Sequence, residues 1–553
     1  MRTIRPSDSF YILALILLLA VPFLLRPAKE EGAGSRRPLV IVSPHNEAVQ
    51  FEFEQAFGRW LAGRGAEPAA IDWRNIGGTA EIARYLDSSF QAADRAGLAG
   101  IGIDIFFGGG EYDHSLQAKK GHSVPCGVRA RHPELLNEAV IPPVFSGEKF
   151  YDPEDHWYGC CLSSFGICYN EDFFKTMKAA SEAGPEAHAL PVRIDSGEKR
   201  ESKAAAPLET GQASLPGASH GMLRHLNPPR AWEDLADFSF YGHLALADPA
   251  KSGSINKAFE MLIQEQMFAY LKTAGKSAES AGKADLAEGW RRALGLVRTI
   301  GANARYFTDA AGKVTVDVAQ GNAAAGMCID FYGRFESETV ERNEGSKRMH
   351  YVMPRGGSSV SVDPVSILRG APNRALAEQF VDFCLSVEGQ LIWNTRVGRP
   401  GGPSKYALRR LPIRRDLYIP KHLENMSDPE AMPYENAGKF TYQPAWTGRY
   451  FGIIRAIVKT MCIEPHGELR RAWKAINDAG GPEKCPEAMA VFTALPPGTE
   501  YGPALDQSAR AITDKLAEAR LMREWTEFFR DRYQRAAELA GEEGRRGKGT
   551  RRR

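Results

Sequence analysis

Polar and glycine residues follow several apolar runs near the N-terminus, and they are candidates for binding a ligand. They are Ser43, His45, Asn46, Gly78, Thr79 and Gly109. Thr79 stands at the start of an expected helix, as do Ser252, Gly253 and Ser254 further along. Free backbone N–H groups and the helix dipole favour anions at such positions. Ordinary helix capping also uses these residue types. Because several such positions occur along the chain, we favour the binding of a small anionic solute.

A second group of candidates lies in the middle of the chain. Asp330 supplies a carboxylate, and the rings of Phe331 and Tyr332 offer faces on which an organic solute stacks. An alternative is that Asp330 and Tyr332 form a structural hydrogen-bonding pair. Asp363 either recognises a cationic group or braces the backbone, and both interpretations stay open. With the imidazole of His45, these donors leave a metal ion as an alternative ligand.

Cysteine-based catalysis is the hypothesis that we weigh against binding. Cys160 and Cys161 lie near His156, so a thiol and an imidazole are available. No cysteine-enzyme motif surrounds them, and the chain has neither an HExxH sequence nor a P-loop lysine. We expect no enzyme activity and no cofactor, and a cysteine-dependent hydrolase is the alternative.

Disulfides are possible among the eight cysteines if the protein is exported. We predict a bridge between Cys462 and Cys485, and we expect Cys126 to be able to reach Cys160 or Cys161. Cys328 and Cys384 lie in apolar runs and are expected to be buried thiols.

The elements that position these residues begin with three apolar runs at 38–42, 69–73 and 101–107. Each run is followed by a polar or glycine-rich turn, and then by a helical pattern. This alternation predicts a parallel α/β sheet, in which ligands bind at the carboxyl ends of the strands. Further along, 157–170 and 351–368 read as extended, while 255–271, 287–300 and 373–393 read as helices. The chain is expected to be mostly helical beyond Asn425.

Composition and charge narrow the class of protein. The 553 residues are enough for two to four domains, and 43% hydrophobic with 25% charged residues is typical of a globular protein. A net charge of +2 argues against nucleic acid as a partner. The segment 180–229 is rich in Ala, Pro, Ser and Gly and predicts a surface insertion. The basic tail 541–553 predicts a solvated segment.

The N-terminus predicts export. Arg2 and Arg5 precede an apolar run from Phe10 to Leu25, which is the order of an export signal. No small-residue cleavage site follows this run directly, so we expect an uncleaved anchor in the inner membrane with the bulk of the chain on the periplasmic side. Cleavage between Ala28 and Gly34, which would leave a soluble periplasmic protein, is the alternative.

Several segments together resemble the iron-type branch of the extracellular solute-binding proteins of ABC importers. They are LADPAKSGS (246–254), GNAAAGMCIDFYGR (321–334), GAPN (370–373), LSVEGQLIW (385–393), and the pattern CYN (168–170) with Pro229, Trp232 and Leu235. Each segment is short, but they occur in the family's order between residues 38 and 418.

The resemblance implies a two-lobed α/β clamp of the type II periplasmic-binding-protein class, with a hinge between the lobes and an added helical C-terminal extension. Residues 1–37 would be the anchor and linker, 38–158 the first lobe, 159–360 the second lobe, 361–500 a return to the first lobe, and 501–553 a helix with the basic tail. Two crossing strands are implied near 159–169 and 354–367, with Ser163 and Ser164 in the first crossing as further ligand-binding candidates.

The family also implies an ABC permease as partner and, in ferric-binding members, a tyrosine ligand at the position of Tyr332. Those members offer two adjacent tyrosines, whereas Phe331 and Gly333 flank Tyr332 here, which weakens the iron interpretation. A ligand-sensing ectodomain that acts through a membrane partner is the alternative function.

Overall fold

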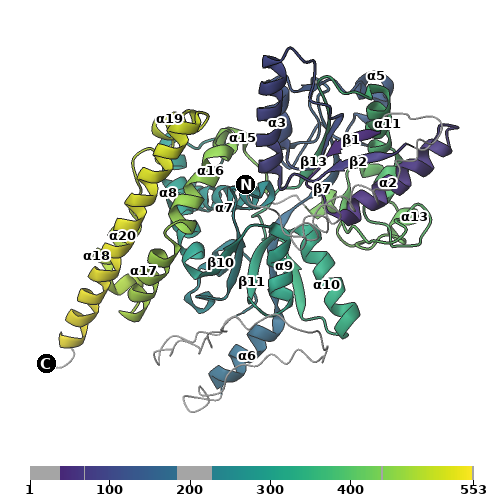
Figure 1. Ribbon diagram of the computed structural model, residues 1–553. Coiled ribbons are helices and arrows are strands. Elements are labelled where there is room, and N and C mark those ends of the chain that lie inside the picture. Colours follow the sequence, from purple (N-terminus) through teal and green to yellow (C-terminus); the bar gives the residue numbers. More distant parts are fainter. Residues whose placement is uncertain (1–37, 68, 183–226, 437–439, 551–553) are drawn as a thin grey trace, which may run out of the picture. The chain divides into compact units, whose positions relative to one another are not determined.

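The structure is a computed structural model that describes residues 38–67, 69–182, 227–436 and 440–550. Two mixed sheets organise the chain from Leu39 onward, and helices pack around them (Figure 1). Each sheet has parallel strands that alternate with helices, together with antiparallel strands contributed from elsewhere in the sequence.

The first sheet contains the three strands expected from the N-terminal apolar runs. In spatial order its strands are β14 (Leu411–Pro412), β7 (Tyr158–Ser163), β13 (Ser361–Leu368), β3 (Ile105–Phe107), β1 (Leu39–Val42) and β2 (Ile71–Arg74), with β4 (Ser123–Val124) also paired to β13. All four residues of β1 are buried, which explains the uninterrupted apolar run LVIV.

The second sheet repeats this arrangement. Its strands, in spatial order, are β10 (Ala304–Thr308), β9 (Leu244–Ala247), β11 (Ala325–Ile329), β8 (Phe165–Asn170) and β12 (Met349–Val352). In both sheets the second parallel strand flanks the first, the third lies on the other side, and an antiparallel strand follows. This repeated order is a doubly wound topology in two copies.

The chain passes between the two sheets at two places. Strand β7 of the first sheet and β8 of the second are separated only by Ser164. The return runs from β12 through residues 353–360 to β13. Both crossings fall where the family resemblance places them, and the two-lobed type II clamp is confirmed.

Helices complete both lobes. The first lobe carries α2 (Glu47–Ala62), α3 (Thr79–Arg95), α4 (Glu111–Lys119), α5 (Val128–Arg131), α11 (Arg374–Leu385), α12 (Val387–Leu391), α13 (Pro420–Leu423), α14 (Pro433–Asn436) and the hairpin β5 (Val144–Phe145)–β6 (Glu148–Lys149). The second carries α6 (Glu171–Glu182), α7 (Gly253–Thr273), α8 (Lys283–Asn303), α9 (Ala311–Ala319) and α10 (Asp330–Glu344).

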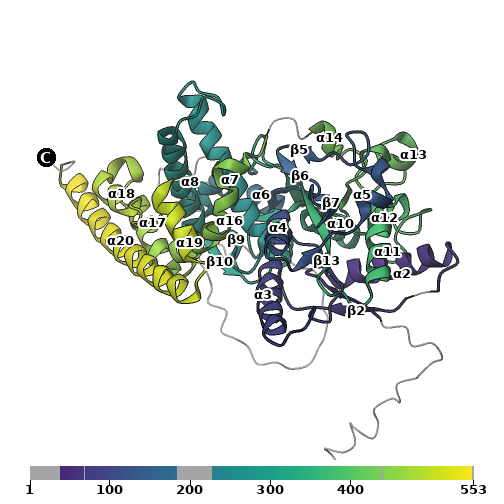
Figure 2. The same cartoon turned by 90° about the horizontal axis from the view of Figure 1, so that it is seen from above.

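The helical C-terminal extension packs on the second lobe. It comprises α15 (Pro444–Thr447), α16 (Phe451–Val458), α17 (His466–Asp478), α18 (Pro486–Phe492), α19 (Pro503–Ala511) and α20 (Lys515–Thr550). Figures 1 and 2 both show it beside α7 and α8, and its apolar residues join the core of the second lobe. We expected residues 361–500 to return to the first lobe, whereas from Phe440 onward their buried residues belong to the second. An amphipathic pattern shows that a helix is covered, but not by which lobe.

Residues 330–334 open α10, where Gly333 packs against the ring of Tyr351. One local expectation differs from the structure. The helix expected over 373–393 is broken at Ser386, which caps α12 by accepting a hydrogen bond from the Gly389 N–H. The basic tail, which was expected to be a solvated segment, continues α20 to Thr550, and the side chains of Arg545 and Arg546 are exposed.

The predicted anchor, its cleavage range and most of the 180–229 insertion lie outside the described residues. Among the residues that are described, no helix is long and apolar enough to cross a membrane. All eight cysteines are buried free thiols, so the predicted Cys462–Cys485 bridge and the bridge from Cys126 do not form in this structure. The expectation that Cys328 and Cys384 are buried thiols is confirmed.

Candidate functional site

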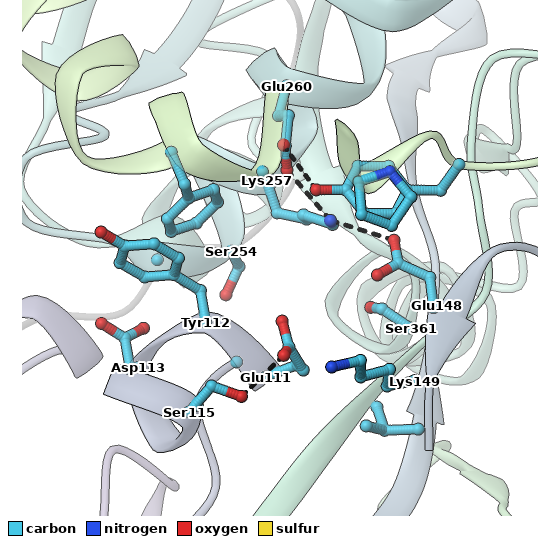
Figure 3. A pocket seen from close by; sticks show the side chains of 18 of the residues that line it. Glu111, Tyr112, Asp113, Ser115, Glu148, Lys149, Ser254, Lys257, Glu260 and Ser361 are labelled. Atoms are coloured by element: carbon cyan, nitrogen blue, oxygen red, sulfur yellow. Dashed lines mark hydrogen bonds and ion pairs between the residues drawn. The ribbon is translucent and has the colours of Figure 1, made fainter. Parts of the chain in front are cut away.

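A cavity of about 440 Å³ is lined by residues from both lobes (Figure 3). The first lobe contributes α4 and the hairpin β5–β6, the second contributes α7, and the crossing strand β13 lies between them. The C-terminal extension adds a wall that contains Tyr442, Pro444, Gly448, Arg449 and Phe451. Four of the predicted ligand-binding residues line this cavity, namely Gly109, Gly253, Ser254 and Asp363.

A buried ion cluster joins the lobes beside the cavity. Lys257 of α7 lies 3.0 Å from Glu148 of β6 and 3.0 Å from Glu260, one turn further along α7 (Figure 3). Burial alone would lower the pKa of Lys257, but the two carboxylates outweigh this and raise it. The cluster therefore holds a charged lysine between two lobes, and its net charge is negative.

Hydroxyl groups complete this cluster. Ser359, from the second crossing, donates to Glu148 at 2.5 Å. Tyr442 and Thr447 donate to Glu260 at 2.8 and 2.6 Å, and Lys257 lies 3.6 Å from the centre of the Tyr442 ring. The C-terminal extension therefore stabilises the same buried charges that connect the lobes.

Asp113 of α4 is the buried acidic group of the cavity that lacks such partners. Its relative exposure is 2%, and within the described part of the chain its carboxyl group has no hydrogen bond or ion pair. Burial raises its pKa to about 6. Glu111, on the same helix, accepts a hydrogen bond from Ser115 at 2.7 Å, and both residues line the cavity.

The predicted residues at helix starts lie where the two lobes touch. A side-chain carbon at Gly78 would come within 2.4 Å of the Lys251 carbonyl oxygen, and one at Gly253 within 3.4 Å of Thr79 Cβ. A side-chain carbon at Gly109 would come within 2.6 Å of Thr79 Cγ2. The segments that carry these residues are in direct contact, and Gly78 and Thr79 do not line the cavity.

Three predicted residues are used in local structure. The Ser43 hydroxyl accepts from the His45 N–H at 3.1 Å, and Asn46 caps α2 by accepting from the Val49 N–H at 3.1 Å. Ser252 caps α7 by accepting from the Ile255 N–H at 3.3 Å. For these residues the structure favours capping and turn formation over contact with a ligand.

Asp363 braces the crossing strand β13. It forms an ion pair with Arg410, accepts a hydrogen bond from Ser163 at 3.0 Å, and lies 3.5 Å from His45. Burial alone would raise its pKa, but Arg410 and His45 outweigh this and lower it. Arg410 also lies 3.7 Å from the centre of the Phe331 ring. Of the two open interpretations for Asp363, these contacts favour the brace.

The group at Asp330 lies apart from the main cavity. Asp330, Ser163 and Ser164 line a second cavity of about 60 Å³, and Asp330 pairs with Arg334 at 3.2 Å rather than with Tyr332. Tyr332 packs on Phe331, with ring centroids 4.1 Å apart, and against Gly312. Neither aromatic residue lines the main cavity, because α10 turns them away from it.

The metal interpretation of Tyr332 finds no geometric support. No cluster of three or more His, Cys, Asp or Glu side chains that could hold a metal ion occurs among the residues described. Burial raises the pKa of Tyr332.

The thiols considered for catalysis are also disfavoured as nucleophiles. Cys160 and Cys161 are fully buried, and burial raises the pKa of both well above the usual value. His156 instead has its Nδ1 atom 3.2 Å from the Ser123 hydroxyl.

Most of the charged residues that line the cavity were not predicted from the sequence. They are Glu111, Asp113, Lys119, Glu148, Lys149, Lys257, Glu260 and Arg449. One signal was present: Glu111 and Asp113 directly follow Gly108–Gly110, at the end of a strand where a ligand is expected. No sequence signal pairs Lys257 with Glu148, because a hairpin 109 positions away supplies the partner.

Comparison with known proteins supports the family resemblance. Residues 203–420 match the family model of bacterial extracellular solute-binding proteins. An uncharacterized protein of Haemophilus influenzae is 26% identical over 166 residues, which are 30% of this chain and 40% of that protein. The phosphoglycerate transport regulatory protein PgtC of Salmonella typhimurium is 22% identical over 312 residues, which are 55% of this chain and 66% of that protein.

Solved structures of similar proteins include the periplasmic binding protein AfuA of Actinobacillus pleuropneumoniae with bound fructose-6-phosphate. It is 16% identical, with a TM-score of 0.44, and the match covers 73% of this chain and 99% of AfuA. Iron-bound HitA of Pseudomonas aeruginosa is 16% identical, with a TM-score of 0.46, and the match covers 77% of this chain and 99% of HitA. The family match confirms the predicted resemblance to extracellular solute-binding proteins over residues 203–420.

Proposed function

We propose that this chain is the extracytoplasmic solute-binding component of an ABC importer and that it holds a small organic solute between its lobes. The observation that carries this proposal is the cavity lined jointly by α4, β6, α7 and the crossing strand β13. A volume of about 440 Å³ falls in the range of small-molecule sites, which is about 300–1,000 Å³. Movement of the lobes about the two crossings would open and close it.

The proposed partners follow from the same role. A permease in the inner membrane would distinguish the ligand-bound arrangement of the lobes from the free one. The apolar segment Phe10–Leu25 would direct export across that membrane. If it stays uncleaved, it would also anchor the protein on the outer side; if it is cleaved, the protein would be released there.

The test is ligand-dependent stabilisation of the purified protein. A panel of organic anions, amines, sugars and ferric citrate is screened by thermal shift, and a bound solute is expected to raise Tm and to reduce the radius of gyration in small-angle scattering.

A cavity-filling variant provides the control. Ser254→Trp places an indole inside the cavity and should abolish the shift, whereas Ser277→Trp, at an exposed position of the loop between α7 and α8, should retain it. A shift that survives Ser254→Trp would place the ligand elsewhere, and no shift with any compound would contradict the binding role.

A further inference from the structure

The helix starts that we expected to attract an anion are already occupied by carboxylates of the chain itself. At α3, the Glu81 carboxylate accepts a hydrogen bond from the Gly78 N–H at 2.9 Å. At α7, a side-chain carbon on Gly253 would lie 3.6 Å from Asp113 Oδ2, so this carboxyl group lies against the first turn of that helix. The positive potential of both helix starts is therefore offset by resident acidic groups.

The charge of the buried lining is also negative. Four carboxylates line the cavity at α4, β6 and α7, namely Glu111, Asp113, Glu148 and Glu260, and Lys257 is the ammonium group buried among them. Asp363 also lines the cavity, but Arg410 neutralises it. Lys119, Lys149 and Arg449 contribute the opposite charge from exposed positions, where solvent screens them.

Asp113 is the buried cavity residue whose carboxyl group lacks a partner among the described residues. A buried carboxylate without a hydrogen bond or ion pair is costly, and natural structures rarely keep one without a reason. Its surroundings include the ring of Tyr112, which packs on Phe451 with centroids 4.7 Å apart, and both rings line the cavity. Carboxylates beside aromatic rings form an environment that favours an organic cation.

We propose that the cavity binds a solute through a cationic nitrogen, a protonated amine or guanidinium group, which Asp113 and Glu111 hold between α4 and α7. This inference rests on the proposed solute-binding function and specifies the ligand class of the same site. It replaces the anionic solute expected from the helix starts. The cation would give Asp113 the ion pair that the chain does not supply.

Isothermal titration calorimetry of the purified protein tests this directly. The cationic probes are 1,4-diaminobutane and agmatine, and the anionic probes are inorganic phosphate, glycerol 3-phosphate and citrate. We expect at least one cationic probe to bind. Asp113→Asn should weaken its binding by at least about tenfold, and Glu111→Gln by less, because Ser115 still contacts that side chain. Asp531→Asn, at an exposed acidic residue of α20, should leave the affinity unchanged.

Thermal unfolding without ligand separates a binding role from a structural one. If Asp113 serves the ligand, Asp113→Asn should unfold at the same temperature as the parent protein or higher, because it removes an unpaired buried charge. A lower Tm together with unchanged amine affinity would show that Asp113 only stabilises the start of α7, and would overturn the inference.

The two proposals fail in different ways. Binding of an anionic probe that Asp113→Asn does not weaken, with no binding of any cationic probe, would overturn the cation inference and leave the solute-binding function standing. If no cationic or anionic probe bound, and the wider screen described above also gave no shift, both would fail.

Discussion

Two buried aspartates of this protein differ in the partners of their carboxyl groups and in the direction of their pKa shifts. Asp363, in the crossing strand β13, is surrounded by Arg410, Ser163 and His45, and its pKa is lowered. Asp113, in the cavity wall, has no such partner within the described residues, and burial raises its pKa to about 6. The comparison separates a carboxylate that the framework pairs from one that the proposed cation would pair.

The largest effect should come from breaking the framework pair. Arg410→Met leaves Asp363 buried without its main counter-charge, and we expect a loss of about 3–5 kcal/mol in the free energy of unfolding. Denaturant titration measures it. The double variant with Asp363→Leu should recover part of the loss, whereas Arg415→Met, at an exposed arginine, should change stability by less than about 0.5 kcal/mol. A small effect of Arg410→Met would remove the distinction between the two aspartates.

The ion cluster between the lobes should give the next largest effect. Lys257→Met leaves Glu148 and Glu260 together without a cation, at a cost of about 2–3 kcal/mol, since the hydroxyl groups of Ser359, Tyr442 and Thr447 still donate to them. The variant should regain stability as the pH falls, because burial raises the pKa of Glu148 and the folded state then takes up a proton there. Lys474→Met, in an exposed pair with Asp478, should cost less than about 1 kcal/mol and show no such recovery.

Asp113 should produce a pH-dependent effect of opposite sign. Its folded pKa of about 6 lies above the ordinary value of 3.8, so the folded state binds more protons between these values. The parent protein should therefore lose stability relative to Asp113→Asn as the pH rises from about 4 to 6, by up to about 3 kcal/mol, and the difference should be constant above that range.

The charged groups that act on Asp113 come from three helices. They are Arg455 of α16, Glu111 and Lys120 near α4, and Asp87 of α3. Thermal unfolding in a series of buffers checks the profile, with Asp531→Asn as the pH-independent control. Parallel profiles for the parent protein and Asp113→Asn would show that the buried acid is not the titrating group.

The sequence predicted the framework better than the cavity. Apolar strands, helix periodicity and the family's short motifs are local signals, and they placed both crossings correctly. The cavity depends on distant partners: Glu148 meets Lys257, and Tyr442 meets Glu260, only after both lobes and the extension have packed. Helix starts were also ambiguous. The sequence showed where N–H groups become free at Gly78 and Gly253, but not that Glu81 and Asp113 would face them.

A substitution at Gly78, where the two lobes are in contact, should have the smallest effect on stability. It tests whether glycine is needed there for the lobes to meet beside the cavity. The backbone of Gly78 has φ −71°, which alanine adopts readily, so Gly78→Ala acts through space alone. Its added methyl group would meet the Lys251 carbonyl oxygen at 2.4 Å and should cost about 1 kcal/mol or separate the lobes there. Gly58→Ala, in α2 with nothing within 4 Å, should instead stabilise the protein slightly. Small-angle scattering should then show a larger radius of gyration for Gly78→Ala than for Gly58→Ala. Equal radii with equal stability would mean that the lobes tolerate a side chain at this contact, and that glycine is not needed to bring α3 and α7 together around the cavity.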